Sequence, residues 1–318
     1  APVASGLTAD PSSLGLGFAL DDSKEWANVL YYGREGTGKT TAAATAANLP
    51  DARLVLFINA EGGLKPKVLK GLGVNTSRIA AWPAQGEPVT YAGLEKLHVN
   101  LLDQLRNDPG CVTAVVLDSA SEIVSSLREA ATEDRQRRTL AKIRGLPSAT
   151  DFDPTFIDRS DYGVSADQAK RLFRRFRDLP CHFIVTALER EDEETGDLGP
   201  DIQPAVASAL MGYVDCVLHT RADVTADAER FTALTRPNGK SRAKDRYNAL
   251  PVTMANPSFE RVVKYIEGTI AESDDPQQTE LVQAIALDRE NREAAAAAKQ
   301  AERAARRTRT TTKTSTTK

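Results

Sequence analysis

Residues 29–43 read VLYYGREGTGKTTAA and are the most informative stretch of the chain for its fold. They contain the pattern G-x-x-x-x-G-K-[ST], with an apolar, strand-like run before it and a helix-like run after it. Glycines allow the chain to turn sharply and point backbone N–H groups inward, where the start of the following helix adds positive potential. The sequence therefore predicts a binding loop for the phosphates of a nucleoside triphosphate, formed by Gly33, Arg34, Glu35, Gly36, Thr37, Gly38, Lys39, Thr40 and Thr41.

Short apolar runs alternate with longer, charged segments along most of the chain. Runs of five or six apolar residues without polar alternation are typical of strands covered on both faces, and their alternation with helices indicates a mainly parallel sheet. The predicted fold class is α/β, a P-loop NTPase core with helices flanking the sheet. We expect strands at residues 29–32, 54–59, 112–117, 182–187 and 213–218, and helices at residues 39–48, 91–107 and 165–179.

The two ends of the chain differ in composition from this core. Residues 1–24 are expected to be a flexible lead-in, and residues 25–268 the core. The core should close with a β-hairpin, in which RFTALT (230–235) and RAKDRYNAL (242–250) flank the turn signal RPNGKS. Residues 269–318 are expected to form a polar connector, a charged Ala-rich helix at 281–307 and a disordered, basic, low-complexity tail.

Two acidic residues follow apolar runs and are candidates for the chemistry of phosphate transfer. Lys39 would contact the β- and γ-phosphates, and Thr40 would hold Mg²⁺. Asp118 directly ends the run in CVTAVVLD, where a carboxylate gives the metal its second contact; its alternative role is to cap the following helix. Glu61 follows LVLFINA, and a carboxylate at that end of a parallel strand is placed to orient water.

Composition excludes several other classes of function. The net charge of −3 and the pI near 5.8 give no global attraction to nucleic acid, so such binding needs local patches. Three scattered cysteines in or beside apolar runs predict buried thiols, and the three histidines lack metal-ligand spacing. Because no apolar run approaches the ~20 residues of a membrane span and the first residues lack a secretion signal, we expect a cytoplasmic protein with no membrane partner, in the host cytoplasm if it is phage-encoded.

The segments GREGTGKTT, FINAEGGL and VVLDSASEI resemble, in order and spacing, the core of bacterial RecA recombinase. With SDYGVSADQAKRLFRRFRDLP, HFIVTALERE, GYVDCVLH and AKDRYNALP, they look more closely like the phage-encoded, RecA-like ATPases of the Sak group, fourth type, which promote single-strand annealing and recombination. The resemblance spans residues 28–257. It implies ATP and Mg²⁺ as cofactors, Glu61 as the hydrolytic base and Asp118 as the magnesium contact.

The resemblance also implies roles for three residues outside the loop. Thr186 lies near the position from which the family senses the γ-phosphate, although the strand here reads Val-Thr-Ala where RecA ends in Asn-Gln. Lys244 and Arg246 resemble basic residues that reach the γ-phosphate of a neighbouring subunit, which would require a homo-oligomer, either a ring or a filament. The alternative is an exposed basic strand end.

The charge of the segments that hold DNA in this family is mixed. Seven carboxylates between Glu189 and Asp201 would repel phosphate, whereas the segment after residue 127 is basic and carries aromatic residues suited to stacking on bases. No base-reading pattern is present, so sequence-independent binding is expected. The candidate contacts to single-stranded DNA are Arg137, Arg138, Lys142, Arg144, Arg171, Arg174 and Arg175, with a solvated basic face as the alternative.

These patterns favour an ATP-hydrolysing, RecA-like protein that acts on single-stranded DNA in phage-type recombination, annealing and repair, with a single-strand-binding protein as a candidate partner. One alternative is a replication or packaging motor or loader of the same fold. Another is an ATP-dependent oligomeric switch that binds a protein partner through the acidic segment. The sequence leaves open the choice between annealing, strand exchange and loading, and the role of the basic tail.

Overall fold

Within residues 25–144, 153, 155–224 and 229–314, which the computed structural model describes, a ten-stranded sheet forms the centre of the fold. Its main path runs in the order β10-β8-β7-β1-β5-β4-β2-β3, while β6 pairs with β5 and β9 with β7. The six strands from β7 to β3 are parallel, and the other four pair antiparallel. The strands are β1 (Asn28–Gly33), β2 (Val55–Asn59), β3 (Ile79–Trp82), β4 (Ala114–Asp118), β5 (His182–Glu191), β6 (Leu198–Pro200), β7 (Cys216–Val224), β8 (Glu229–Leu234), β9 (Lys244–Asp245) and β10 (Thr253–Ala255).

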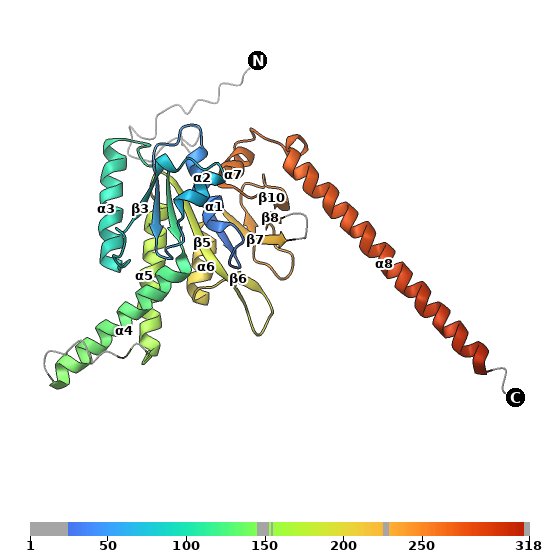
Figure 1. The fold of residues 1–318 in the computed structure, drawn as a ribbon. Helices are drawn as coiled ribbons and strands as arrows, with labels where there is room; N and C mark the ends of the chain where they lie inside the picture. Colours follow the sequence, from blue (N-terminus) through green and yellow to red (C-terminus); the bar gives the residue numbers. More distant parts are fainter. Residues whose placement is uncertain (1–24, 145–152, 154, 225–228, 315–318) are drawn as a thin grey trace, which may run out of the picture.

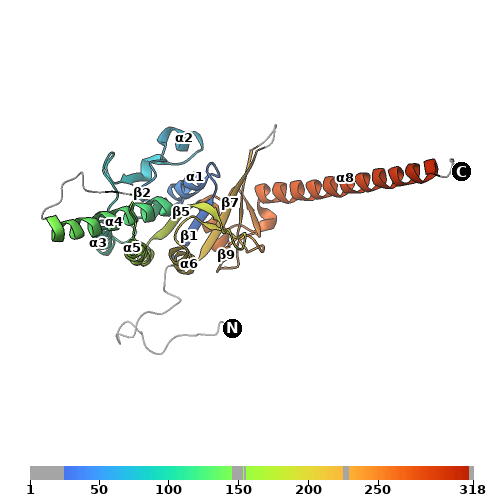
Figure 2. The same cartoon turned by 90° about the horizontal axis from the view of Figure 1, so that it is seen from below.

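Helices cover both faces of the sheet. Figure 2 shows α1 and α2 on one face and α3, α5 and α6 on the other. The helices are α1 (Lys39–Ala44), α2 (Pro66–Gly71), α3 (Tyr91–Asn107), α4 (Ala120–Arg144), α5 (Arg159–Arg177), α6 (Pro204–Tyr213), α7 (Phe259–Ile266) and α8 (Pro276–Thr314), with 3₁₀ turns at Thr45–Asn48, Thr76–Arg78 and Glu272–Asp274.

The residues of β1 show why the central strands are continuously apolar. Leu30 and Tyr32 belong to the core on the side of α5, whereas Val29 and Tyr31 belong to the core on the side of α1, and all four are fully buried. Successive side chains of a strand point to opposite faces, so a sheet covered on both faces needs apolar residues at every position. The mixed α/β fold with a mainly parallel sheet is therefore confirmed.

The parallel strands end at one common edge of the sheet, which we call the carboxyl edge. Gly33 at the end of β1 lies opposite Leu188 of β5, and Asn59 at the end of β2 lies opposite Asp118 of β4. Segments that follow these strands are therefore neighbours in space although they are far apart in the chain.

The predicted terminal hairpin is wrong in its pairing. β8 pairs with β7 through six residue pairs and with β10 on its other side, while Lys244–Asp245 pairs with the start of β7 as β9. RPNGKS is thus a loop between strands that do not pair with each other. The turn signal predicted that residues 242–250 would pair with the strand at 230–235. In the structure, β7 and β10 pair with the two edges of that strand instead.

Several elements differ from the sequence pattern in extent. The strand predicted at 213–218 begins only at Cys216, because Tyr213 ends α6. The sequence pattern did not predict four elements: the edge strand β3, the short β6, and helices α6 and α7. The residues of β3 are half exposed. The predicted helix at 91–107 is confirmed at both ends.

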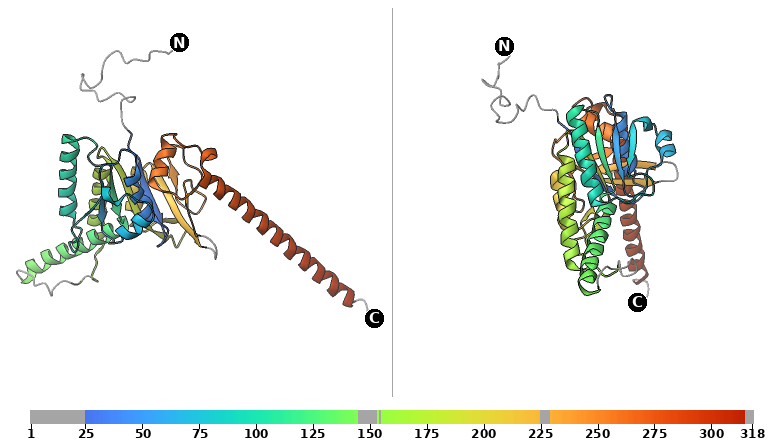
Figure 3. Two further views of the ribbon diagram at one scale, coloured as in Figure 1. Left: turned by 45° about the horizontal axis from the view of Figure 1, so that its top comes forward. Right: turned by 90° about the vertical axis from the view of Figure 1, so that its left-hand side faces the viewer.

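Helices α4 and α5 leave the body of the domain together (Figures 1 and 3). We call residues 128–142 of α4 with residues 155–164 the helical arm. The sequence predicted a helix at residues 165–179, but α5 begins earlier, at Arg159, because Asp158 and Asp161 form a capping box. Arg135 Nε donates to Asp161 Oδ1 at 2.9 Å, and this bond joins the two helices of the arm.

Helix α8 extends from the domain as one long helix (Figure 1). Its start is fixed by Asp275, 2% exposed, which accepts a hydrogen bond of 2.7 Å from the Tyr265 hydroxyl. The helix runs to Thr314 and so includes residues 308–314, which the sequence pattern assigned to the low-complexity tail. The lead-in at 1–24 and the last four residues lie outside the described residues. None of the described helices is long and apolar enough to cross a membrane.

Candidate nucleotide-binding site

The loop between β1 and α1 has the backbone of a phosphate cradle. Gly36 and Gly38 have φ of 74° and 79°, a region that residues with a Cβ rarely adopt. A Cβ on Gly33 would lie 2.4 Å from both the carbonyl oxygen and Oγ1 of Thr220. Thr37 Oγ1 donates to Arg34 O at 2.8 Å and lies 2.9 Å from Thr220 Oγ1, so β7 supports the loop from outside.

The side chain of Lys39 is folded under this loop. Only 8% of the residue is exposed, and Nζ donates to Gly33 O at 2.9 Å and to Arg34 O at 2.7 Å. Burial lowers the pKa of Lys39, while the carboxylates of Glu61 and Asp118 oppose that shift. The ammonium group thus lies beside the loop, hydrogen-bonded to two carbonyl groups. Phosphate oxygens of a bound nucleotide would replace these carbonyl partners.

Asp118 is at the end of β4 and is 1% exposed. Thr40 Oγ1 lies 3.1 Å from each of its carboxylate oxygens, and Thr186 Oγ1 donates to Oδ1 at 2.5 Å. Burial raises the pKa of Asp118, and the hydrogen bonds from Thr186 and Thr40 lower it. A hydroxyl and a buried carboxylate that converge in this way are the oxygen donors that Mg²⁺ prefers.

Glu61 stands just beyond the end of β2 and is exposed. The backbone N–H groups of Ala60 and Glu61 both donate to Asp118 O, at 2.8 and 3.1 Å, which fixes the chain after β2 against the end of β4. The side chain lines the same cavity as Lys39 and Thr40. The structure therefore brings together Glu61, Lys39, Thr40, Asp118 and Thr186, as the sequence predicted, at the carboxyl edge.

Two adjoining cavities form a groove over the loop. The first, about 320 Å³, is lined by Glu35, Lys39, Thr40, Glu61 and Phe231. The second, about 430 Å³, shares Gly38, Thr41 and Phe231 with the first and continues between α1 and α7. The first cavity adjoins the loop expected to bind phosphates, and the volume of the second is typical of small-molecule sites.

The match to a family model fits this geometry. The model for an AAA domain matches residues 26–247, from the start of β1 past β9. The chain belongs to the AAA domain family. This family comprises P-loop ATPases of the AAA type, which indicates nucleotide hydrolysis in this AAA domain. A comparison with curated proteins finds no match to the chain.

Four further residues lie at or beside the loop of this AAA domain: Phe231, Thr220, Glu189 and His219. No local pattern in the sequence predicted their placement there. Thr220 and Thr37 are 183 residues apart in the chain. Phe231 comes from β8, and its ring lies 3.3 Å from the position of a Cβ on Gly38. No local pattern encodes such contacts, because they depend on the positions of β7 and β8 in the sheet.

Lys244 and Arg246 lie at the opposite edge of the sheet from the loop. β9 pairs with the first residues of β7, and Lys244 Nζ donates to Val214 O at 2.7 Å, just beyond the end of α6. Arg246 Nη1 donates to Asp215 Oδ1 at 2.7 Å. Both cationic groups thus have partners within the chain, and a contact to the γ-phosphate of a neighbouring copy stays a prediction.

The residues predicted to contact DNA form two separate groups. One group lies near the far end of α4: Arg137, which pairs with Glu133, Arg138, which pairs with Asp134 at 2.7 Å, Lys142, and Arg144, which ends the helix. The other group, Arg171, Arg174 and Arg175, is exposed on the last turns of α5, where Arg174 Nη2 donates to Tyr213 Oη at 3.1 Å and Arg175 pairs with Glu95 at 2.8 Å. Because Thr132 and Arg135 of α4 contact Asp161 in the first turn of α5, the groups lie at opposite ends of the helix pair, and the structure does not bring them together.

Replacing Gly33 with alanine tests the close approach of β7 to the loop. We expect the free energy of unfolding to fall by about 1–3 kcal/mol, because a Cβ would press into the backbone of Thr220, and ATP affinity to fall with it. Gly71→Ala is the control, since a Cβ there meets nothing within 4 Å. Urea unfolding of both variants measures the effect, and equal stabilities would contradict the described packing.

Proposed function

We propose that the protein is a Mg²⁺-dependent ATPase related to the RecA-like phage ATPases of the Sak group, and that it acts on single-stranded DNA in annealing or recombination. The proposal rests on the residues that the groove gathers, on the resemblance over residues 28–257, and on the helical arm. Assembly of several copies into a ring or filament is part of the same proposal.

Each side chain in the groove has a defined task in hydrolysis. Lys39 leaves the carbonyls of Gly33 and Arg34 and binds phosphate oxygens. Thr40 and Asp118 would hold Mg²⁺, which would supply positive charge against the phosphate oxygens. Glu61, exposed at the rim, accepts a proton from the attacking water and orients it. Thr186, bonded to Asp118, keeps that carboxylate in place.

The observation that carries the DNA proposal is a pair of exposed aromatic rings on the helical arm. Phe156 and Tyr162 are 64% and 42% exposed. The guanidinium of Arg135 lies 5.5 Å from the Phe156 ring centroid, and that of Arg128 lies 5.5 Å from the Tyr162 ring centroid. Aromatic rings beside cationic groups are the usual platform for stacking unpaired bases. Helix α4, which carries the first part of the arm, follows β4 and so begins at the carboxyl edge near Asp118.

Removal of these rings is expected to weaken binding of single-stranded DNA. Phe156→Ala and Tyr162→Ala should each cost about 1 kcal/mol or more of binding free energy, the usual contribution of a base–aromatic stack. The measurement is fluorescence anisotropy with a labelled oligonucleotide at two salt concentrations. Val68→Ala, exposed on α2, is the control. Unchanged affinity in both arm variants would exclude the arm as the binding surface.

The acidic hairpin favours a second candidate function. Residues 189–201 comprise the end of β5, a turn and β6, and the carboxylates of this segment would repel DNA. An ATP-dependent switch that docks a basic protein partner there would assemble with ATP and retain no oligonucleotide. A motor or loader of the same fold would instead move along DNA with fast turnover, which a translocation assay detects.

A further inference from the structure

A cluster of side chains holds the phosphate-binding loop from its outer side. Leu188 of β5 lies opposite Gly33 of β1. The next residue of β5, Glu189, therefore lies beside Arg34, the residue after Gly33. Arg34 Nε lies 3.4 Å from Glu189 Oε1, and the other carboxylate oxygen of Glu189 is hydrogen-bonded to Nε2 of His219. The Glu189 side chain is 9% exposed and the His219 side chain 1%. We call Glu189 and His219 the loop clamp.

The surroundings of His219 define its proton state. Its ring stacks on the Tyr32 ring, with centroids 4.6 Å apart and planes 5° from parallel. Burial lowers the pKa of His219, Glu189 opposes the shift, and Arg221 adds to it. The imidazole is therefore neutral near pH 7, with Nε2–H donating to the Glu189 carboxylate. Nδ1 is buried without a partner among the described residues, so the bond to Glu189 is the polar contact that orients the ring.

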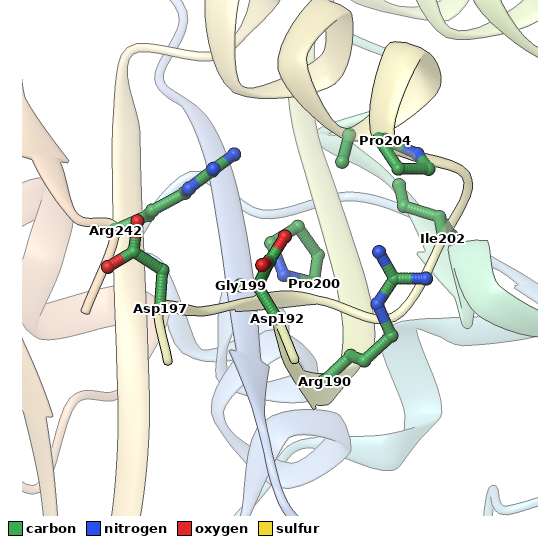
Figure 4. A pocket seen from close by; sticks show the side chains of 9 residues that line it. Arg190, Asp192, Asp197, Gly199, Pro200, Ile202, Pro204 and Arg242 are labelled. Atoms are coloured by element: carbon green, nitrogen blue, oxygen red, sulfur yellow. The ribbon is translucent and has the colours of Figure 1, made fainter. Parts of the chain in front are cut away.

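The loop clamp is anchored in turn to the base of the acidic hairpin. The hydroxyl of Tyr32, the residue before Gly33, donates to Arg242 O at 2.6 Å and to Leu198 O at 3.2 Å. Only a small cavity of about 40 Å³ remains there, and Figure 4 shows Arg190 and Arg242 on opposite sides of Pro200 around it. Tyr32, on which the ring of His219 stacks, is thus fixed by hydrogen bonds to Leu198 and Arg242.

The clamp reaches Lys39 through Arg34. The Glu189 carboxylate holds the side chain of Arg34, and the carbonyl of Arg34 accepts the Lys39 ammonium at 2.7 Å. The residue after His219, Thr220, donates to Tyr32 O at 3.1 Å and contacts Thr37. Glu189 therefore contacts, through the Arg34 side chain, the segment from which the lysine projects, and His219 does so through its neighbour Thr220.

We propose that Glu189 and His219 are positioning residues of the ATPase reaction, which hold the Arg34–Glu35 part of the loop in the geometry that the transition state needs. Because neither residue lines the groove, they act on kcat through the loop and leave the ground-state contacts to ATP in place. This inference rests on the proposed ATPase activity and not on DNA binding.

Steady-state ATP hydrolysis without DNA tests the clamp in the full chain. Glu189→Ala and His219→Phe remove the hydrogen bond, while phenylalanine keeps a ring against Tyr32. We expect kcat to fall roughly tenfold or more with KM changed less than threefold, since small misplacements of a loop act on the chemical step. His219→Gln, which retains a donor, should recover part of the rate. The double variant should be no slower than the slower single variant, because the two residues act as a unit.

Glu191→Ala and His98→Phe are the matched controls, since both residues lie away from the loop and should keep the wild-type rate. Thermal unfolding of each variant separates lost positioning from lost folding. A kcat within twofold of wild type for Glu189→Ala would contradict the positioning role of the loop clamp. A rise in KM as large as the fall in kcat would also contradict it. A wild-type rate no higher than that of Glu61→Gln would instead show that the proposed ATPase activity is wrong. The proposed role of the loop clamp, which depends on that activity, would then be wrong as well.

Discussion

Replacing Glu61 with glutamine is expected to lower kcat for ATP hydrolysis by about 100-fold or more, the usual contribution of a general base. The amide keeps the shape of the side chain but cannot accept the proton of the attacking water. Glu61 is exposed at the rim of the groove, so its replacement should leave ATP affinity and the free energy of unfolding nearly unchanged. A phosphate-release assay and binding of a fluorescent ATP analogue measure the two effects separately.

The matched control for this variant is Glu87→Gln, which changes an exposed glutamate outside the groove. Its turnover should equal that of the wild type. If Glu61→Gln kept a rate within threefold of wild type, another group would have to orient the water, and the assignment of Glu61 would be wrong. A loss of ATP binding in this variant would also contradict its placement at the rim.

Replacing Lys39 with methionine should act on binding and hydrolysis together. Lys39 would form charge-assisted hydrogen bonds to phosphate, each worth about 1.5–3 kcal/mol, so ATP affinity should fall about 10-fold to 100-fold. Stability should change by less than about 1 kcal/mol, because methionine removes a charge that burial disfavours while it leaves two carbonyls without a donor. Isothermal titration with ATP and urea unfolding measure these two quantities.

Lys70→Met provides the control, since Lys70 is exposed on α2 and lines neither cavity of the groove. It should bind ATP as the wild type does. Wild-type affinity in Lys39→Met would mean that the ammonium group does not reach the phosphates, and the nucleotide would have to bind elsewhere. A large loss of stability would mean that its bonds to Gly33 and Arg34 are structural in the main.

The sequence predicted the groups of the groove because each one follows a strand of recognisable pattern. Gly33, Glu61 and Asp118 all come directly after apolar runs, and parallel strands bring their ends to one edge. Phe231 could not be predicted in this way. Its position depends on β8 pairing with β7 and β10, and no local sequence pattern selects those partners over residues 242–250.

The helical arm shows the same limit at a smaller scale. The signal for its second helix is present in DRSD, residues 158–161, where an aspartate at each end completes a capping box. We did not predict a helix start from this signal, because the residues around it are charged and show no helical pattern. The separation of the two basic groups could not be predicted, because it depends on the antiparallel packing of α4 against α5 and not on the sequence of either helix.

The most direct test of the central claim is the rate of ATP hydrolysis by the full chain with and without a single-stranded oligonucleotide, at low and moderate salt. If the protein acts on single-stranded DNA, we expect the oligonucleotide to stimulate turnover, higher salt to weaken this stimulation, and Glu61→Gln to abolish turnover. Turnover that depends on Glu61 but does not respond to the oligonucleotide, with no retention of the oligonucleotide even at low salt, would contradict the action on DNA and leave an ATPase with another partner.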